Sequence, residues 1–182
     1  MNLLISREPV LNRSRAITAN RLVAHLPSGE DACARAGTEL NALADVWPDA
    51  RTVFLGLGGA MPDAGLLEWQ VPPNVMIEIP GAALERPATV DLMRRLGTAG
   101  VPMCLDGFRA GMALPTGAPF RFVLADATAT VAGAPGILLA KGLVDNGQFD
   151  TCLQKGFGGA AGWFFLRGAT PAKSLKPGQA QT

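Results

Sequence analysis

Two acidic residues in this sequence stand where chemistry is often done. Asp106 ends a short apolar run, residues 102–105, and Gly107 follows it at once. Glu78 lies inside a second apolar run, residues 74–79. Carboxylates at the carboxyl-terminal ends of parallel strands serve α/β enzymes as metal ligands and general bases. Because a hard divalent cation needs several clustered oxygen ligands, two acids alone make a poor metal site. The chemistry therefore depends on what the other strand ends supply.

Two cationic residues and one histidine occupy other expected strand ends. Arg21 lies in the apolar segment 16–23, and Lys141 directly follows the apolar run 136–140. A buried lysine in a barrel can form a Schiff base, but no acid or base stands beside Lys141 in the sequence. His25 is the single histidine, so any Ser-His-Asp or Cys-His mechanism would have to use it. A surface position at a strand end is the simpler interpretation of His25.

Two motifs could contact a nucleotide. Residues 56–60 follow an apolar run as a dinucleotide-binding loop would, but Met61 stands where the third glycine belongs and Pro62 follows. Residues 163–165, Trp-Phe-Phe, could stack on a base. Consecutive aromatic residues on an interior strand usually belong to a core, however. We therefore expect a core role for these aromatics and an ordinary turn at the glycines.

Composition narrows the classes of protein. A chain of 182 residues with 48% hydrophobic content can bury the core of a single domain. The net charge is +1 with no basic stripe, which argues against nucleic acid as a partner. The apolar runs are far shorter than the roughly 20 residues that span a bilayer, and no leader is evident, so we expect a cytoplasmic protein without membrane contact. The cysteines, Cys33, Cys104 and Cys152, are too far apart for a zinc knot or a disulfide framework.

The elements that position these residues alternate along the chain. Apolar runs predict strands at 3–5, 16–23, 52–57, 74–79, 102–105, 120–125, 136–140 and 161–166. Helical spacing predicts helices at 32–36, 39–45, 63–69, 89–96 and 148–154. The first two strands suggest a hairpin. Continuous apolar strands that alternate with helices indicate a mainly parallel sheet covered on both faces, and a barrel fits at least as well as an open sheet.

Some outer helices of such a barrel are missing from the sequence. The linker between residues 105 and 120 is rich in Gly and Pro, and only ten residues, 126–135, separate the next two strands. That is too few for a crossover helix with its loops. If the strands close into an α/β barrel, a domain over residues 1–168 would therefore be shortened by the loss of outer helices. Residues 169–182 are poor in apolar side chains and are expected to form a linker or disordered tail.

Six segments, taken in order, resemble one family. They are residues 5–13, 53–58, 75–80, 96–108, 139–145 and 155–167. They resemble the EAL domains, cyclic di-GMP phosphodiesterases, in the form often fused to an HDOD domain. The resemblance extends to Gly168. It implies a modified triosephosphate-isomerase-type barrel whose first strand runs antiparallel, and hydrolysis in which two divalent cations activate a water and hold the phosphate.

The same resemblance shows that the metal site of the family is largely replaced. The glutamate of the Glu-Ala-Leu motif falls on Arg21, and the second aspartate of the Asp-Asp-Phe motif falls on Gly107. The glutamate of a later motif falls on Lys141. Glu78 and Asp106 remain as vestigial ligands. The resemblance also places the asparagine ligand of the family on Gly56, the lysine that ends the fifth strand on Leu124, and the glutamine before Gly-Tyr on Ala161. Three residues after Glu78 the sequence has Gly81.

These replacements imply a module without catalytic residues, metal or cofactor. We expect Glu78 and Asp106 to form ion pairs with Arg21 and Lys141, because a buried acid persists only with a partner. The module would then act in signalling by contacting another protein or a neighbouring HDOD domain, through the outer wall that the missing helix leaves bare. The alternative is a receptor that binds cyclic di-GMP without hydrolysing it, with Arg21 and Lys141 on the phosphates.

Overall fold

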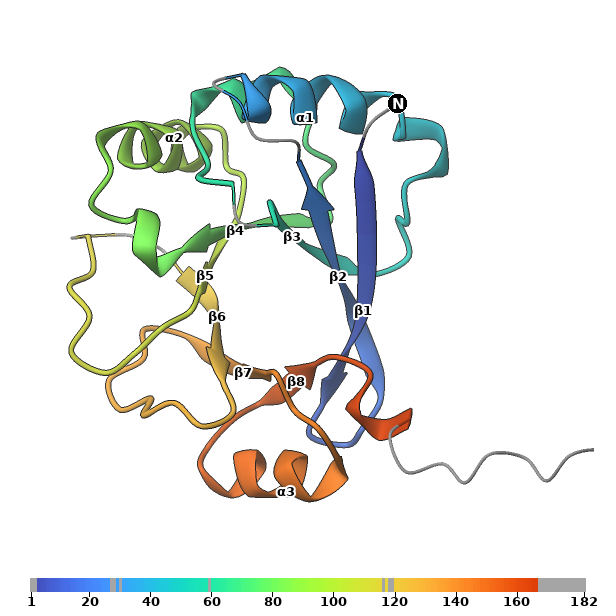
Figure 1. Cartoon of the computed structure of the whole chain (residues 1–182), viewed down its shortest axis with the longest axis vertical. Coiled ribbons are helices and arrows are strands. Elements are labelled where there is room, and N and C mark those ends of the chain that lie inside the picture. The colour runs from blue at the N-terminus through green and yellow to red at the C-terminus, as the bar shows by residue number, and fades with distance from the viewer. Residues whose placement is uncertain are drawn as a thin grey trace, which may run out of the picture.

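The computed structural model describes residues 3–26, 29, 31–58, 60–115, 117 and 120–166. The predicted tail, residues 169–182, lies outside this part of the chain. Within the described residues eight strands close into a barrel (Figure 1). The strands are β1 (Leu4–Asn12), β2 (Ile17–His25), β3 (Thr52–Gly56), β4 (Val75–Pro80), β5 (Met103–Asp106), β6 (Phe120–Asp126), β7 (Ile137–Lys141) and β8 (Gly159–Ala161).

The barrel is parallel except at its first strand. β1 pairs antiparallel with both β2 and β8, and each later strand pairs parallel with the next. The β1–β2 hairpin turns where the Asn12 carboxamide oxygen accepts hydrogen bonds from the amides of Ser14 and Ala16. The antiparallel first strand is therefore confirmed. The carboxyl-terminal ends of β2 to β8 meet at one opening, the mouth, to which β1 brings its amino-terminal end.

Three α-helices cover the barrel within the described residues, and the predicted loss of outer helices is confirmed. They are α1 (Ala32–Asn41), α2 (Pro87–Thr98) and α3 (Asn146–Gln154). Short 3-10 helices, η1 (Ala44–Val46), η2 (Ala64–Glu68), η3 (Gly81–Ala83) and η4 (Phe164–Leu166), complete the elements. The described parts of the β3–β4, β5–β6 and β6–β7 connections contain no α-helix. Among the described residues, no helix is both long enough and apolar enough to cross a membrane.

The predicted break at Gly37 was wrong, because α1 runs through this residue without interruption. A Cβ atom at Gly37 would lie 2.9 Å from the backbone nitrogen of Trp69. The glycine therefore lets α1 pack closely against the end of η2, and this packing outweighs the low helix propensity of glycine.

Apolar side chains fill the barrel below the mouth. The interior cluster consists of Val10, Ala19, Phe54, Met76, Cys104, Leu124, Leu139 and Ala161. A larger cluster lies between the barrel and the helices α1, α2 and η2, and a third lies under α3. All three cysteines are buried and free, so each is a small residue of the core.

The strand predicted at residues 161–166 was wrong. β8 ends at Ala161, and Phe164–Leu166 is a 3-10 helix. Gly162 has a φ of 130°, a backbone conformation that stops the strand and favours glycine. Phe164 is buried and stacks on Phe149, with ring centroids 5.1 Å apart. The core role predicted for the aromatics thus holds for Phe164 but not for Trp163, which is 48% exposed.

The outer wall beside β6 and β7 is not bare as expected. The connection between these strands, residues 127–136, has no helix, but Val131 and Ala134 pack against the outer core. The neighbouring β5–β6 connection joins it through a backbone hydrogen bond from Ala110 to Thr130 at 3.0 Å. Two loops therefore cover the wall where helices would otherwise lie.

Alanine substitutions at two glycines test whether close packing of β8 against β1 closes the barrel. A Cβ atom at Gly159 would overlap the backbone carbonyl of Leu11 on the adjoining strand. Gly159→Ala should therefore destabilise the protein by about 3 kcal/mol, the upper end of an ordinary overpacking penalty. Gly97 in α2 has nothing within 4 Å of an added Cβ. Gly97→Ala should stabilise by about 0.5–1 kcal/mol through helix propensity. Urea unfolding of both variants measures the difference, and equal effects would contradict a closed β8–β1 contact.

Candidate functional site

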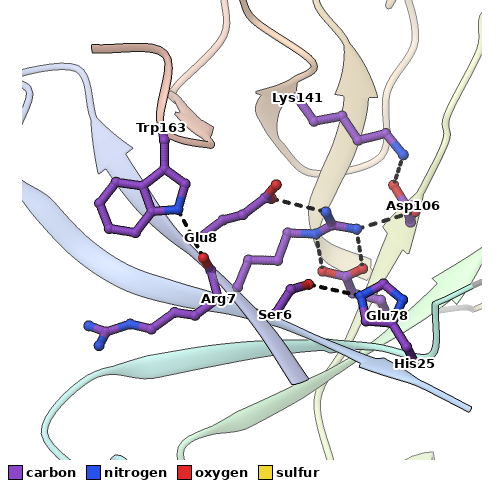
Figure 2. Close-up of polar contacts among 9 residues, drawn as sticks. Ser6, Arg7, Glu8, His25, Glu78, Asp106, Lys141 and Trp163 are labelled. Carbon is purple, nitrogen blue, oxygen red and sulfur yellow. Dashed lines mark hydrogen bonds and ion pairs between the residues drawn. The ribbon is translucent and has the colours of Figure 1, made fainter. Parts of the chain in front are cut away.

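Arg21 lies at the centre of the mouth. Alternation along β2 places it on the same inward face as Ala19, two residues earlier. Its Nε donates to the Glu78 carboxylate at 2.7 Å and its Nη2 donates to the second oxygen of that carboxylate at 2.8 Å (Figure 2). Two parallel bonds of this kind are the strongest geometry between an arginine and an acid. Arg21 and Glu78 are therefore fixed to each other.

Two further acids and a lysine extend this pair. Nη1 of Arg21 donates to Glu8 on β1 at 3.1 Å, and its Nη2 lies 3.8 Å from a carboxylate oxygen of Asp106. The other oxygen of Asp106 accepts a hydrogen bond from Lys141 Nζ at 2.5 Å. The expected ion pairs are thus present. Among the described residues, three carboxylates and two cations form this cluster, which carries a formal charge of −1 when all are ionised.

Glu8 is the member of the cluster that the sequence analysis missed. It stands directly opposite Arg21 in the β1–β2 register. The signal was present in the hairpin, because Glu8 is an acid two residues before Val10, an inward apolar residue of β1. Its position opposite Arg21 follows only from the pairing register of β1 and β2. The strand predicted at residues 3–5 ended before Glu8, so this register could not be read from it. The mouth is consequently richer in acids than we expected, although each acid faces a cation.

Burial sets the electrostatics of the central pair. Only 2% of the Glu78 side chain and 13% of the Arg21 side chain are exposed. Burial raises the pKa of Glu78, and its hydrogen bonds to Arg21 oppose that rise. Burial would lower the pKa of Arg21, but its bonds to Glu78 and the charge of Asp106 outweigh this effect and raise it. Arg21 is therefore a permanent cation, and its loss would leave Glu78 as an uncompensated buried acid.

Gly56 makes room for the pair. It ends β3, and a Cβ atom built there would lie 2.5 Å from a carboxylate oxygen of Glu78. Real Cβ atoms do not approach an oxygen so closely, so any larger residue at this position would push Glu78 away from Arg21. The glycine that replaces the asparagine ligand implied by the resemblance is thus part of the same arrangement as Arg21.

The residues of the mouth do not fit a pair of divalent cations. Within the described part of the chain, no three or more His, Cys, Asp or Glu side chains are grouped so that they could hold a metal ion. The carboxylates of Glu8 and Glu78 converge on the guanidinium of Arg21. A divalent cation bound by these carboxylates would lie within a few ångströms of that fixed positive charge, where repulsion is strong at low dielectric.

The other candidate residues do not assemble a catalytic group. His25 ends β2 and is exposed, with its Nε2 at 3.0 Å from the Ser6 hydroxyl. No acid among the described residues is found to orient the ring, so the pair lacks the third member of a triad. Cys104 is fully buried below the cluster, and burial raises the pKa of its thiol well above the usual range. Lys141 donates a hydrogen bond to Asp106, so its nitrogen is engaged by a carboxylate and is not free to attack a carbonyl carbon.

The two segments that could contact a nucleotide differ in the structure. In the glycine segment 56–60, Gly58 has a φ of 52° and packs against the end of β2, where a Cβ would lie 2.9 Å from the Ala24 carbonyl. This close contact explains the glycine; Gly59 lies outside the described residues. Trp163 donates its indole N–H to the backbone carbonyl of Arg7 at 3.0 Å, next to Glu8, with half of the ring exposed. Trp163 is therefore available at the rim of the mouth.

Solved structures with the same architecture are those of EAL proteins. The chain matches a c-di-GMP complex of the PaMucR phosphodiesterase with a TM-score of 0.59 and 12% identity, over 92% of this chain and 96% of that one. It matches a c-di-GMP-bound standalone EAL protein from Vibrio cholerae O395 with a TM-score of 0.63 and 16% identity, over 90% and 91%. The chain has an EAL-like fold.

A third match is with a protein that is longer than this chain. A manganese and cyclic di-GMP complex of BlrP1 from Klebsiella pneumoniae aligns with a TM-score of 0.67 and 16% identity, over 91% of this chain and 55% of BlrP1. This chain thus spans about half of BlrP1. No family model and no curated protein sequence matches it. At these identities the similarity concerns the fold, and the residues of the mouth have to be judged by their own geometry.

Replacing Arg21 tests whether its charge holds the mouth together. Arg21→Met keeps most of the apolar stem but leaves Glu78 buried without a partner, and should destabilise by about 3–5 kcal/mol at pH 7. Removing Arg21 raises the pKa of Glu78 further. The deficit relative to the parent protein should therefore shrink as the pH falls toward the ordinary glutamate value of about 4.3, because protonation then removes the unpaired charge.

The control for this variant is the same change in an exposed ion pair. Arg94 in α2 pairs with Asp91 at 2.6 Å, but 69% of its side chain is exposed. Arg94→Met should leave the unfolding midpoint almost unchanged. Chemical unfolding of both variants between pH 4 and 8 provides the measurement. A pH-independent deficit for Arg21→Met would contradict an electrostatic role.

Proposed function

We propose that this chain is a catalytically inactive EAL-like module that acts in signalling through contacts with another protein, or with a neighbouring regulatory domain such as HDOD. One observation carries the proposal. The guanidinium of Arg21 lies among the carboxylates of Glu8 and Glu78, where metal-assisted hydrolysis would need divalent cations. Without such cations no group at the mouth activates a water for attack on a phosphodiester.

The helix-poor side of the barrel supports a contact function. Residues 110–119 and 127–136 contain no charged side chain. Ala113 and Ala132 are exposed within them, and Met112, Leu114 and Val131 are partly buried beneath. An uncharged surface loses little hydration when a partner covers it, and interface cores are depleted in charged residues. We infer that the described residues of these two loops, 110–115, 117 and 127–136, form the contact site, and we call them the helix-poor surface.

The second candidate is a receptor that binds cyclic di-GMP without hydrolysing it. It is favoured by Trp163, whose half-exposed indole at the rim can stack on a base, and by the c-di-GMP present in structures of similar fold. Against it, Arg21 is fully engaged by carboxylates. Lys141 is the more accessible cation, with 24% of its side chain exposed against 13% for Arg21. A phosphate would have to displace Asp106 from Lys141.

One titration separates these functions. The chain is titrated calorimetrically with cyclic di-GMP in magnesium, manganese or neither, and each sample is analysed by chromatography for ring-opened product. The proposal expects neither heat nor product. Binding without product, lost in Trp163→Ala and Lys141→Ala, would establish the receptor in its place. Metal-dependent product would overturn both, and the PaMucR phosphodiesterase serves as the positive control.

Site-specific photocrosslinking tests the contact surface. A photoreactive amino acid is placed at Ala113 or Ala132 in the helix-poor surface, and at exposed Thr151 on α3 as the matched control. Irradiation in native cells should give one discrete heavier species from the first two positions and none from Thr151, because only covered positions crosslink. Equal crosslinking from all three positions, or none from any, would contradict the assignment of this surface.

A further inference from the structure

The barrel has a hollow at the end opposite the mouth. A cavity of about 190 Å³ lies among the amino-terminal ends of β2, β3, β6 and β7 and the carboxyl-terminal end of β1. Its walls come from both halves of the barrel, because Val10 and Ala19 line one side and Leu139 the other. We call this hollow the basal cavity. None of the charged residues of the mouth lines this cavity.

The basal cavity has a buried apolar floor. Phe54 and Phe122 lie in its wall and meet edge to face, with ring centroids 5.3 Å apart. Val10, Ala19 and Leu139 are each no more than 5% exposed. Along β4 and β5 the inward residues Met76 and Cys104 precede Glu78 and Asp106 by two positions, so an apolar layer separates the basal cavity from the charges of the mouth.

The entrance of the basal cavity is apolar as well. Ile137 at the start of β7 lines it and is 50% exposed. Thr18 and Thr52 contribute the hydroxyl groups of the rim, while the Asn12 carboxamide oxygen is already occupied by the amides of the hairpin turn. Among the described residues, no charged side chain lines the basal cavity. A charged ligand would therefore lose its hydration there without compensation.

Size and chemistry together select the ligand. We propose that the basal cavity is a binding site for a small uncharged molecule built around one aromatic ring. An apolar protein cavity of about 150 Å³ stays dry and accepts benzene, whereas drug-sized ligands need about 300 Å³ or more. The basal cavity lies between these sizes. Its rim hydroxyls allow one hydroxyl or amine substituent on the ring. None of the residues that line the basal cavity belongs to the helix-poor surface or to the charged cluster of the mouth, so this site does not rest on the proposed function.

Methyl-resolved NMR tests the site with benzene as the probe. Titration should give saturable shifts in the methyl groups of Val10, Leu11, Ile137 and Leu139, with a dissociation constant of about 1 mM, as expected for so few ligand atoms. Benzoate should bind at least about tenfold more weakly, because its carboxylate would be desolvated. Ala19→Leu fills the basal cavity and should abolish the shifts, whereas the same change at exposed Ala113 should leave them intact.

Three outcomes would overturn the inference. The first is the absence of saturable shifts at these methyl groups in the parent protein, a result that needs no variant to fold. The second is a set of benzene shifts centred on Leu3 and Leu26, which line a separate groove beside α1. The third is movement of the same methyl groups when the protein is concentrated without benzene, because the occupant would then be a side chain of a second copy.

Discussion

The ion pair between Arg21 and Glu78 is the constraint on which the mouth of this barrel depends. Glu78 is almost fully buried, and a buried carboxylate without a partner is far more costly than a buried pair. Neither residue can therefore change alone. Gly56 is subject to the same constraint, because only a residue without a Cβ leaves room for the Glu78 carboxylate where it pairs with Arg21. The three positions act as one unit that holds the guanidinium of Arg21 among carboxylates.

The fold divides polar and apolar interiors between its two ends. Inward positions along a strand alternate, and in β2, β4, β5 and β7 an inward apolar residue precedes the charged residue at the mouth by two positions. β4 contributes Met76 and then Glu78, and β5 contributes Cys104 and then Asp106. The apolar layer excludes water from beneath the ion pairs, which strengthens them. The same layer separates the basal cavity from the charged residues of the mouth.

A mainly parallel sheet covered on both faces could be predicted from the sequence, because its strands are continuous apolar runs. Those runs fit an open sheet as well as a barrel, and the choice of the barrel came from the resemblance to EAL domains. The pairing of Asp106 with Lys141 could also be expected, since both residues stand at strand ends that meet at one opening. β8 could not be placed, because three small residues carry no periodicity and the aromatics beyond Gly162 imitated a strand. Glu8 was missed for a different reason: its contact with Arg21 depends on cross-strand register, which the extent of the hairpin sets and local composition does not.

The charge balance of the mouth bears on which partner it can accept. Cyclic di-GMP is an anion with two phosphates, and the cluster around Arg21 already has one more carboxylate than it has cations. A phosphate near Arg21 would compete with a bidentate, buried acid and would meet repulsion from the neighbouring carboxylates. Lys141 could exchange Asp106 for a phosphate, but Asp106 would then be left with only its longer contact to Arg21 at 3.8 Å. The exchange thus replaces one charge pair by another with no gain in number. A protein that covers the uncharged helix-poor surface faces no such competition, which is why the geometry favours contact over nucleotide recognition.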